Sequence, residues 1–178
     1  MTAAHRSAPT LETGRLRLRA WRRDDREPYF AILQEPAVFR HFGPEPLGIE
    51  ECWRRLNASV GSWQMNGFGG WAVERKSDGQ LLGMTALFTA WRDLEPEFGD
   101  QPEMGWIFAT EAHGQGLAGE ACRAVLDWAS QNLAPIPIWA IIAPANQPSI
   151  NLALKLGFEP LHETDYHGEP ILVLKRPA

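Results

Sequence analysis

Hydrophobic and polar positions alternate strictly near the start of the chain, in the segment RLRLRA at 15–20. Leu16, Leu18 and Ala20 fall on one side of an extended backbone, and the arginines between them fall on the other. A period of two residues is typical of a strand that covers a core with one face. The pattern therefore predicts a first strand whose leucines are buried and whose arginines, at positions 15, 17 and 19, face water.

A longer period, close to 3.6 residues, indicates helices elsewhere in the chain. Apolar residues recur at helical spacing in several segments. Gly67 and Gly157 each follow such a segment, and Gly157 suits the left-handed residue that commonly ends a helix. Four helices are predicted: one directly after Asp24 and Asp25, either of which can cap it, and three over 48–67, 120–133 and about 147–156.

Between these helices lie short apolar or alternating runs that predict further strands. The segment 138–143, IWAIIA, is continuously apolar, which is typical of a strand buried on both faces. A turn at 77–79 joins two strands as a hairpin. The remaining strands are expected at 71–75, 81–88, 103–108 and on both sides of Tyr166, His167 and Gly168. The order of elements predicts an α/β domain built on a mixed sheet.

Composition and charge narrow the function. The chain has 178 residues, which suits one domain, expected over 1–178 with a core of about 11–176. A net charge of −5 argues against a nucleic-acid partner. Two cysteines and five histidines show no metal-binding spacing, and no apolar leader or membrane span is visible. We therefore expect a cytoplasmic protein with no metal and no membrane partner.

The aromatic residues include eight tryptophans, an unusual number for this length. Trp53, Trp63 and Trp128 have the helical phase of neighbouring apolar residues, which predicts that they belong to the core. Trp91 precedes the acidic segment AWRDLEPEFGDQP and is a candidate for lining a substrate cleft. Cys122 falls on an apolar helix face and is also expected in the core.

The segment HGQGLAG at 113–119 contains G-x-G-x-x-G, the spacing of a dinucleotide-binding loop. That fingerprint needs a strand running directly into the first glycine and an acidic residue roughly 20 residues further on. Here five residues separate the predicted strand from Gly114, and no acidic residue lies between Asp127 and Glu159. The context therefore argues against NAD or FAD.

The same glycines still suit another phosphate ligand. A helix begins at about Gly116 to Gly119, and the first amide N–H groups of a helix have no partner within it. The helix dipole adds roughly half a positive charge at that end. Together these features can bind an anion without a basic side chain. The alternative is a glycine-rich turn that merely caps an ordinary helix.

The motifs taken together resemble those of the GNAT acyltransferases. HGQGLAGEA resembles the family's motif A, Q/R-x-x-G-x-G/A, with His113 at the first position. NQPSINLALKLGF resembles the segment N-x-x-S/A…K-x-G-F, and LETGRLRLRAW and DGQLLGMTAL resemble the RimJ/RimL-like ribosomal-protein branch. The resemblance covers nearly the whole chain. It implies a single-domain fold with a mostly antiparallel sheet, flanking helices and splayed fourth and fifth strands.

The resemblance also implies acetyl-CoA as the donor and an amine as the acceptor. The pantetheine arm would pair with the fourth strand at Trp106, Ile107 and Phe108. Asn146 would contact that arm near the thioester, or serve as a helix cap, or both. The pyrophosphate would contact the glycine loop and His113, whose side chain is partly charged near neutral pH. The loop residues are Gly114, Gln115, Gly116, Leu117, Ala118 and Gly119.

Two residues are candidates for catalysis. Many members of the family carry a tyrosine at the position of Ala153, and Ser149, one helical turn earlier, offers a hydroxyl instead. Glu103 at the start of the fourth strand is the candidate base or water-positioning residue, or simply a charge at a strand end. The preferred acceptor is a peptide α-amine, whose pKa is about 7.7–8.0, rather than a lysine, whose pKa is about 10.4.

Three points stay open at the level of sequence. A polycationic small molecule, such as an aminoglycoside or a polyamine, is the alternative acceptor, because four acidic residues stand in the loop after Trp91. A non-catalytic acetyl-CoA-binding module is a second alternative, because the family's tyrosine is absent. The chain is expected to be a monomer or a homodimer. The acidic residues are Asp93, Glu95, Glu97 and Asp100.

Overall fold

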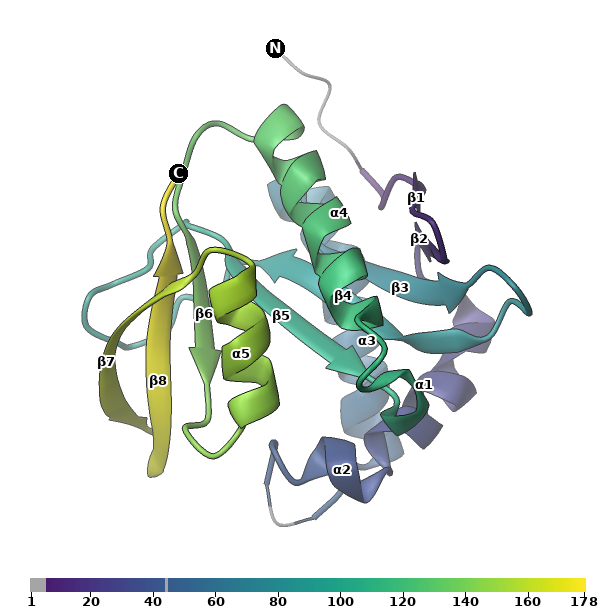
Figure 1. Ribbon diagram of the computed structural model, residues 1–178, viewed down its shortest axis with the longest axis horizontal. Helices are drawn as coiled ribbons and strands as arrows, with labels where there is room; N and C mark the ends of the chain where they lie inside the picture. Colours follow the sequence, from purple (N-terminus) through teal and green to yellow (C-terminus); the bar gives the residue numbers. More distant parts are fainter. Residues whose placement is uncertain (1–5, 44) are drawn as a thin grey trace.

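The computed structural model describes residues 6–43 and 45–178. Residues 1–5, which belong to the segment inspected for a leader, lie outside the described part. The structure is built on one eight-stranded sheet in the order β1-β2-β3-β4-β5-β6-β8-β7. Figure 1 shows this sheet with helices on both faces. The strands are β1 (Leu11–Glu12), β2 (Leu16–Arg19), β3 (Gly70–Arg75), β4 (Leu81–Phe88), β5 (Glu103–Phe108), β6 (Ile138–Ile142), β7 (Glu159–Tyr166) and β8 (Glu169–Arg176).

In the described part of the chain, five α-helices accompany the sheet. Figure 1 shows α4 and α5 on the near face of the sheet and α1 and α3 behind it. The predicted mixed, mostly antiparallel sheet with flanking helices is confirmed, because only the β5–β6 pair among the described strands is parallel. The helices are α1 (Arg26–Leu33), α2 (Pro36–Phe39), α3 (Ile49–Asn66), α4 (Leu117–Asn132) and α5 (Gln147–Lys155).

The feature that positions the site is the divergence of β5 from β6. The register between the two strands is the single pair Glu103 and Trp139, supported by a hydrogen bond of 2.9 Å from the Trp139 N–H to the Pro102 carbonyl. On its other side β5 pairs with β4 along its whole length. Beyond Glu103 the strands separate, and α5 stands beside the opening (Figure 1). This is the predicted splay of the fourth and fifth strands of the expected topology, labelled here β5 and β6.

A cluster of three tryptophans forms the centre of the core beneath α4. Trp63 of α3, Trp71 of β3 and Trp128 of α4 lie with ring centroids 4.7, 5.3 and 5.2 Å apart and their edges toward faces. Such aromatic pairs contribute about 0.5–1.5 kcal/mol each beyond area burial. The core positions predicted for Trp63 and Trp128 are confirmed, as is that of Cys122. The prediction for Trp53 was wrong, because its side chain is 38% exposed at the start of α3.

The first long strand departs from its predicted alternation at one residue. Leu16 and Leu18 are fully buried as predicted, and Ala20 is half-buried. The prediction that all three arginines face water was wrong for Arg19, which is 6% exposed. Helix α1 begins directly after Asp25, but the Asp25 carboxylate accepts from the Arg22 backbone N–H at 2.7 Å instead of capping α1.

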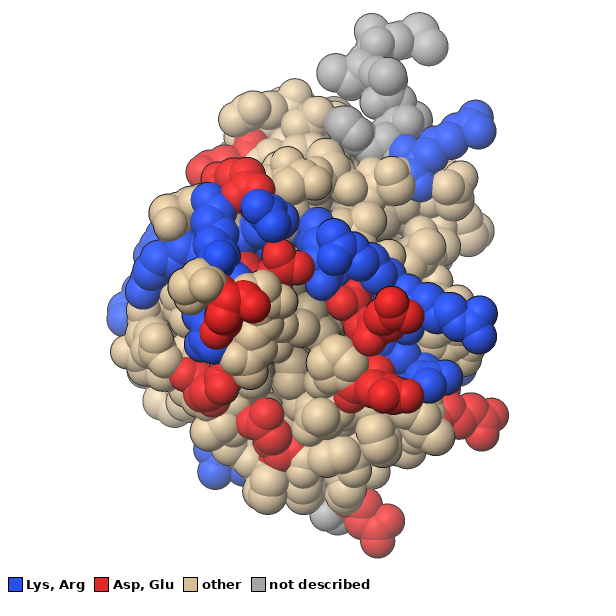
Figure 2. All heavy atoms as spheres, turned by 90° about the vertical axis from the view of Figure 1, so that its right-hand side faces the viewer, with Lys and Arg blue, Asp and Glu red and all other residues tan. Residues whose placement is uncertain are grey.

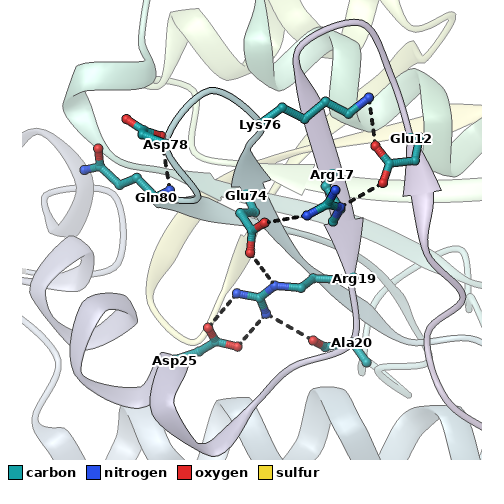
Figure 3. A network of polar contacts seen from close by, with 9 residues as sticks. All are labelled: Glu12, Arg17, Arg19, Ala20, Asp25, Glu74, Lys76, Asp78 and Gln80. Carbon is teal, nitrogen blue, oxygen red and sulfur yellow. Dashed lines mark hydrogen bonds and ion pairs between the residues drawn. The ribbon is translucent and has the colours of Figure 1, made fainter.

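Arg19 is buried because two carboxylates neutralise it. Its guanidinium donates to Asp25 at 2.8 and 2.9 Å and to Glu74 of β3 at 2.8 Å. Figure 3 shows that the chain of ion pairs continues through Arg17 to Glu12. A buried charge is tolerated when it is paired and hydrogen-bonded. Figure 2 shows the surrounding face, where positive and negative side chains are interleaved over β1 to β3.

The described residues contain neither a membrane-spanning helix nor a metal-binding cluster. Within 6–43 and 45–178, no helix is both long and apolar enough to cross a membrane. In the same part of the chain, no group of three or more histidines, cysteines and acidic residues is arranged to hold a metal ion.

Candidate active site

The glycine loop joins β5 to α4 through a short 3-10 helix, Thr110–Ala112. Gly114 and Gly116 have φ angles of 71° and 73°, in the left-handed region that favours glycine. Gly116 is the N-cap of α4, and no described side chain caps the helix there. The first amides of a 16-residue helix therefore remain available at the surface, as an anion site requires.

An ion pair that sequence analysis missed holds this loop in place. The Glu120 carboxylate accepts hydrogen bonds from the Thr13 hydroxyl at 2.6 Å and from the Arg15 backbone and side chain at 2.9 and 2.7 Å. Arg15 also donates to the Gln115 carbonyl at 3.0 Å. Partial burial acts to raise the pKa of Glu120, but these hydrogen bonds outweigh it and hold the pKa below its usual value. The turn between β1 and β2 is thus fastened to the first turn of α4.

The edge of β5 that faces β6 is open between Trp106 and Phe108. The structure records β4 partners for these residues on one side, whereas β6 has separated on the other. The Nε2 atom of His113 lies 2.9 Å from the Phe108 carbonyl oxygen. Since a carbonyl only accepts, this ring nitrogen donates to the end of β5. His113 is therefore hydrogen-bonded to the end of β5, and the phosphate contact that the sequence suggested for it stays a prediction.

Ser149 lies across the opening from β5. The Trp106 indole N–H donates to the Ser149 hydroxyl at 3.3 Å, and Asn146 caps α5 by accepting from the Ser149 backbone N–H at 3.3 Å. The structure thus brings Ser149 and Asn146, which the sequence associated with the thioester end, next to Trp106 of the strand expected to pair with the pantetheine arm. Ala153, one turn further along α5, is fully buried. The capping role considered for Asn146 is present, and among residues 6–43 and 45–178 its side-chain N–H₂ group has no recorded acceptor.

Glu103 lies where β5 and β6 still pair, at the closed end of the opening between them. Its side chain belongs to the face of the sheet that points away from α4. Trp106 packs against the core under α4, whereas Ile107 packs on the α1 side, so the odd-numbered residues of β5 face away from α4. The Glu103 side chain is 5% exposed and takes a two-point ion pair from Arg92 at 2.5 and 2.8 Å. Burial raises the pKa of the Glu103 carboxyl, although the hydrogen bonds from Arg92 act against that shift.

Arg92 connects Glu103 to the last hairpin. Its guanidinium carbon lies 5.2 Å from the centre of the Tyr166 ring, near the tip of the β7–β8 hairpin. Neither residue could be assigned to the site from the sequence, since Arg92 stands in a loop without periodicity and pairs with a residue 11 positions away. The preceding residue, Trp91, is 70% exposed with a φ of 47°. That Trp91 lines a substrate cleft stays a prediction.

The comparisons with known proteins identify the class. The family model described as an acetyltransferase (GNAT) domain matches residues 15–159, and the chain belongs to this family. It is 29% identical over 152 residues to the uncharacterized N-acetyltransferase YoaA of Bacillus subtilis (strain 168), covering 85% of this chain and 83% of that one. The chain is therefore an acetyltransferase of the GNAT class.

Solved structures agree with this assignment. A Bordetella pertussis protein assigned to the GnaT acetyltransferase family superposes with a TM-score of 0.84 at 28% identity, covering 95% of this chain and 99% of that one. A Vibrio cholerae protein described as a ribosomal-protein-serine acetyltransferase has a TM-score of 0.74 at 21% identity, covering 97% and 99%. The second likeness shows the shared fold.

The residues present fit acetyl-CoA, the donor that the family uses. The open edge of β5 offers backbone groups to an amide-containing arm, and the uncapped start of α4 offers N–H groups to a pyrophosphate. Bound acetyl-CoA supplies an acetyl group held as a thioester. The glycine loop and the Trp106–Ser149 contact lie at opposite ends of the free part of β5, so one extended ligand can reach both.

Proposed function

We propose that this chain is a single catalytic domain over 1–178, with a core of about 11–176, that acetylates the α-amine at the N-terminus of a peptide or protein. The observation that carries the proposal is the Ser149 hydroxyl across the open edge of β5, 3.3 Å from the Trp106 indole nitrogen. A hydroxyl there can donate to a sulfur atom that leaves an acyl group. The donor-binding residues are Trp106, Ile107, Phe108, His113, Gly114, Gln115, Gly116, Leu117, Ala118, Gly119 and Asn146.

Each side chain then has a defined task in the transfer. The neutral amine forms a bond to the acetyl carbonyl carbon, and the carbon–sulfur bond breaks. Ser149 donates its hydroxyl proton to the departing thiolate sulfur. The proton lost by the amine passes to Glu103, directly or through a water, and Glu103 then releases it to solvent. Solvent returns a proton to Ser149. The reaction yields an amide and a free thiol, and all protons are accounted for.

The Arg92 ion pair favours an α-amine as the acceptor. Both Glu103 oxygens already accept from Arg92, so the carboxylate acts with its remaining lone pairs and suits a water-positioning role. Deprotonating a lysine at pH 7 costs about 4.6 kcal/mol, against about 1–1.4 kcal/mol for an α-amine. A carboxylate held by an arginine supports the deprotonation of an α-amine far better than that of a lysine.

The experiment compares two acceptors. One is a short peptide with a free N-terminus and no lysine, and the other is the same peptide with a blocked N-terminus and one lysine. Thiol release from acetyl-CoA should occur with the first, rise with pH through roughly 7–8, and fall less than about tenfold in Glu103→Gln. Turnover confined to the blocked, lysine-bearing peptide would defeat the α-amine assignment.

A polycationic small molecule is the second candidate acceptor, on a specific observation. Within the described residues, the four carboxylates of the loop after Trp91 form no ion pair, and all four are exposed. Adding an aminoglycoside and a polyamine to the same screen separates this candidate from the first. A kcat/KM for either above that for the peptide would move the assignment to small amines. Binding of acetyl-CoA without thiol release from any acceptor would favour a non-catalytic module.

A further inference from the structure

Arg123 projects from α4 one turn after Gly119 and lies beside the glycine loop. Its Nη1 and Nη2 atoms lie 3.4 and 3.6 Å from the position that a Cβ atom would take on Gly119. The Cδ1 atom of Leu152 in α5 lies 3.5 Å from the same position. The guanidinium therefore stands at the junction of the first turns of α4 with α5, on the flank of the loop that faces the opening between β5 and β6.

The other cations around the loop are already neutralised by carboxylates. Arg15 pairs with Glu120 on the opposite flank, next to Gly116. Arg123 differs, because within residues 6–43 and 45–178 its guanidinium forms neither a hydrogen bond nor an ion pair, although Asp127 stands one turn further along α4. Arg75 pairs with Asp78 and Glu111, and Lys76 pairs with Glu12.

The phosphate charges of coenzyme A suggest a role for an unpaired arginine beside the glycine loop. Coenzyme A carries a pyrophosphate and, on its ribose, a 3′-phosphate monoester. The amides at the start of α4 and the helix dipole can serve the pyrophosphate, but the monoester brings close to two further negative charges. The chain has a net charge of −5 and repels such a ligand at long range. A local cation that no carboxylate neutralises is required to offset that repulsion.

We propose that Arg123 binds the 3′-phosphate of acetyl-CoA and makes the donor site prefer coenzyme A over its 3′-dephospho form. The inference rests on the proposed function, because it takes acetyl-CoA as the donor. A guanidinium presents a planar fork of N–H donors that suits phosphate oxygens. Arg123 is exposed, so the contact requires little desolvation of the side chain before the ligand arrives.

Calorimetric titration of the purified chain with acetyl-CoA and with 3′-dephospho-acetyl-CoA tests the assignment. The wild type should bind acetyl-CoA about tenfold to a hundredfold more tightly, in line with charge-assisted hydrogen bonds. Arg123→Gln should weaken acetyl-CoA binding by that factor and leave the dephospho ligand unchanged, so that the preference falls below about threefold. Arg23→Gln, which removes the charge of another exposed arginine in the segment before α1, should keep the wild-type preference.

Each other outcome has a definite meaning. Equal affinities of the wild type for both ligands would overturn the inference while the donor assignment stands. So would an Arg123→Gln variant that weakens both ligands alike, since that result would place the guanidinium on the pyrophosphate or the loop itself. A wild type that binds neither ligand would sink the proposed function, and the inference with it. Circular dichroism of both variants checks that the exposed substitutions leave the fold intact.

Discussion

The two ends of β5 are built by different means. At the C-terminal end, backbone groups do the work, because Gly114 and Gly116 expose the amides of α4 with no described side-chain cap. At the N-terminal end, the site consists of side chains, and Glu103 is buried in an ion pair with Arg92. A backbone site keeps its charge pattern at every pH, whereas an ion-paired carboxylate depends on its partner. The acceptor end is therefore sensitive to titration, whereas the α4 amides at the donor end are not.

The largest effect should come from breaking the ion pair at the acceptor end. Arg92→Met leaves the Glu103 carboxylate buried without its partner, which should destabilise the domain by about 3–5 kcal/mol near neutral pH. Burial then raises the pKa of Glu103 unopposed, above its value in the unfolded chain. For such a group, stability is present at low pH and is lost as pH rises through the folded-state pKa. Urea unfolding at pH 5 and pH 8 should show the larger deficit at pH 8.

A double variant provides the control for that prediction. Arg92→Met combined with Glu103→Gln removes the charge and should recover most of the lost stability at pH 8. A deficit that stays the same at both pH values, or that persists in the double variant, would show that Arg92 acts through packing on Tyr166.

The next effect tests the hydroxyl that faces the open edge of β5. Ser149→Ala should lower kcat by roughly 10- to 100-fold with little change in the KM for acetyl-CoA, because donation to the thiolate matters in the transition state. The matched control is Ser130→Ala, a serine on the exposed side of α4, which should behave as wild type. A change in KM alone would reduce Ser149 to a binding or capping residue.

The smallest of the three tests the backbone end of the strand. Gly116→Val should weaken acetyl-CoA binding by at least about tenfold, because a branched side chain resists a φ of 73° and obstructs the amides. Gly79→Val provides the control, since Gly79 has a φ of 74° in the turn between β3 and β4, with open space around it. Both variants carry similar backbone strain. Equal loss of affinity in the two would attribute the effect to strain and contradict the site assignment.

Most elements of the fold could be predicted from the sequence because their signals are local. The periodicities predicted β5 over the residues at which it occurs, and α3 and α5 within about one residue of their observed ends. The glycine spacing at 113–119 likewise indicated a loop that exposes helix amides. The packing partners of a helix or strand face come from distant parts of the sequence, and the predictions of burial were therefore less complete. Trp53 carries the helical phase of a core residue, yet it is 38% exposed, although its neighbour Cys52 is fully buried.

The sequence by itself indicated most of the strands and helices, although not β1 or α2, and the family that the chain resembles. Only the tertiary structure decided which charged side chains are buried and which partners they pair with. Arg15 and Arg19 stand in one alternating run and read alike, but Arg15 fastens the glycine loop through Glu120 while Arg19 is buried between Asp25 and Glu74. Periodicity assigns a side chain to a face, because it depends on backbone geometry alone. Whether a carboxylate lies close enough to pair with the arginine depends on residues up to 105 positions away, which only folding brings together.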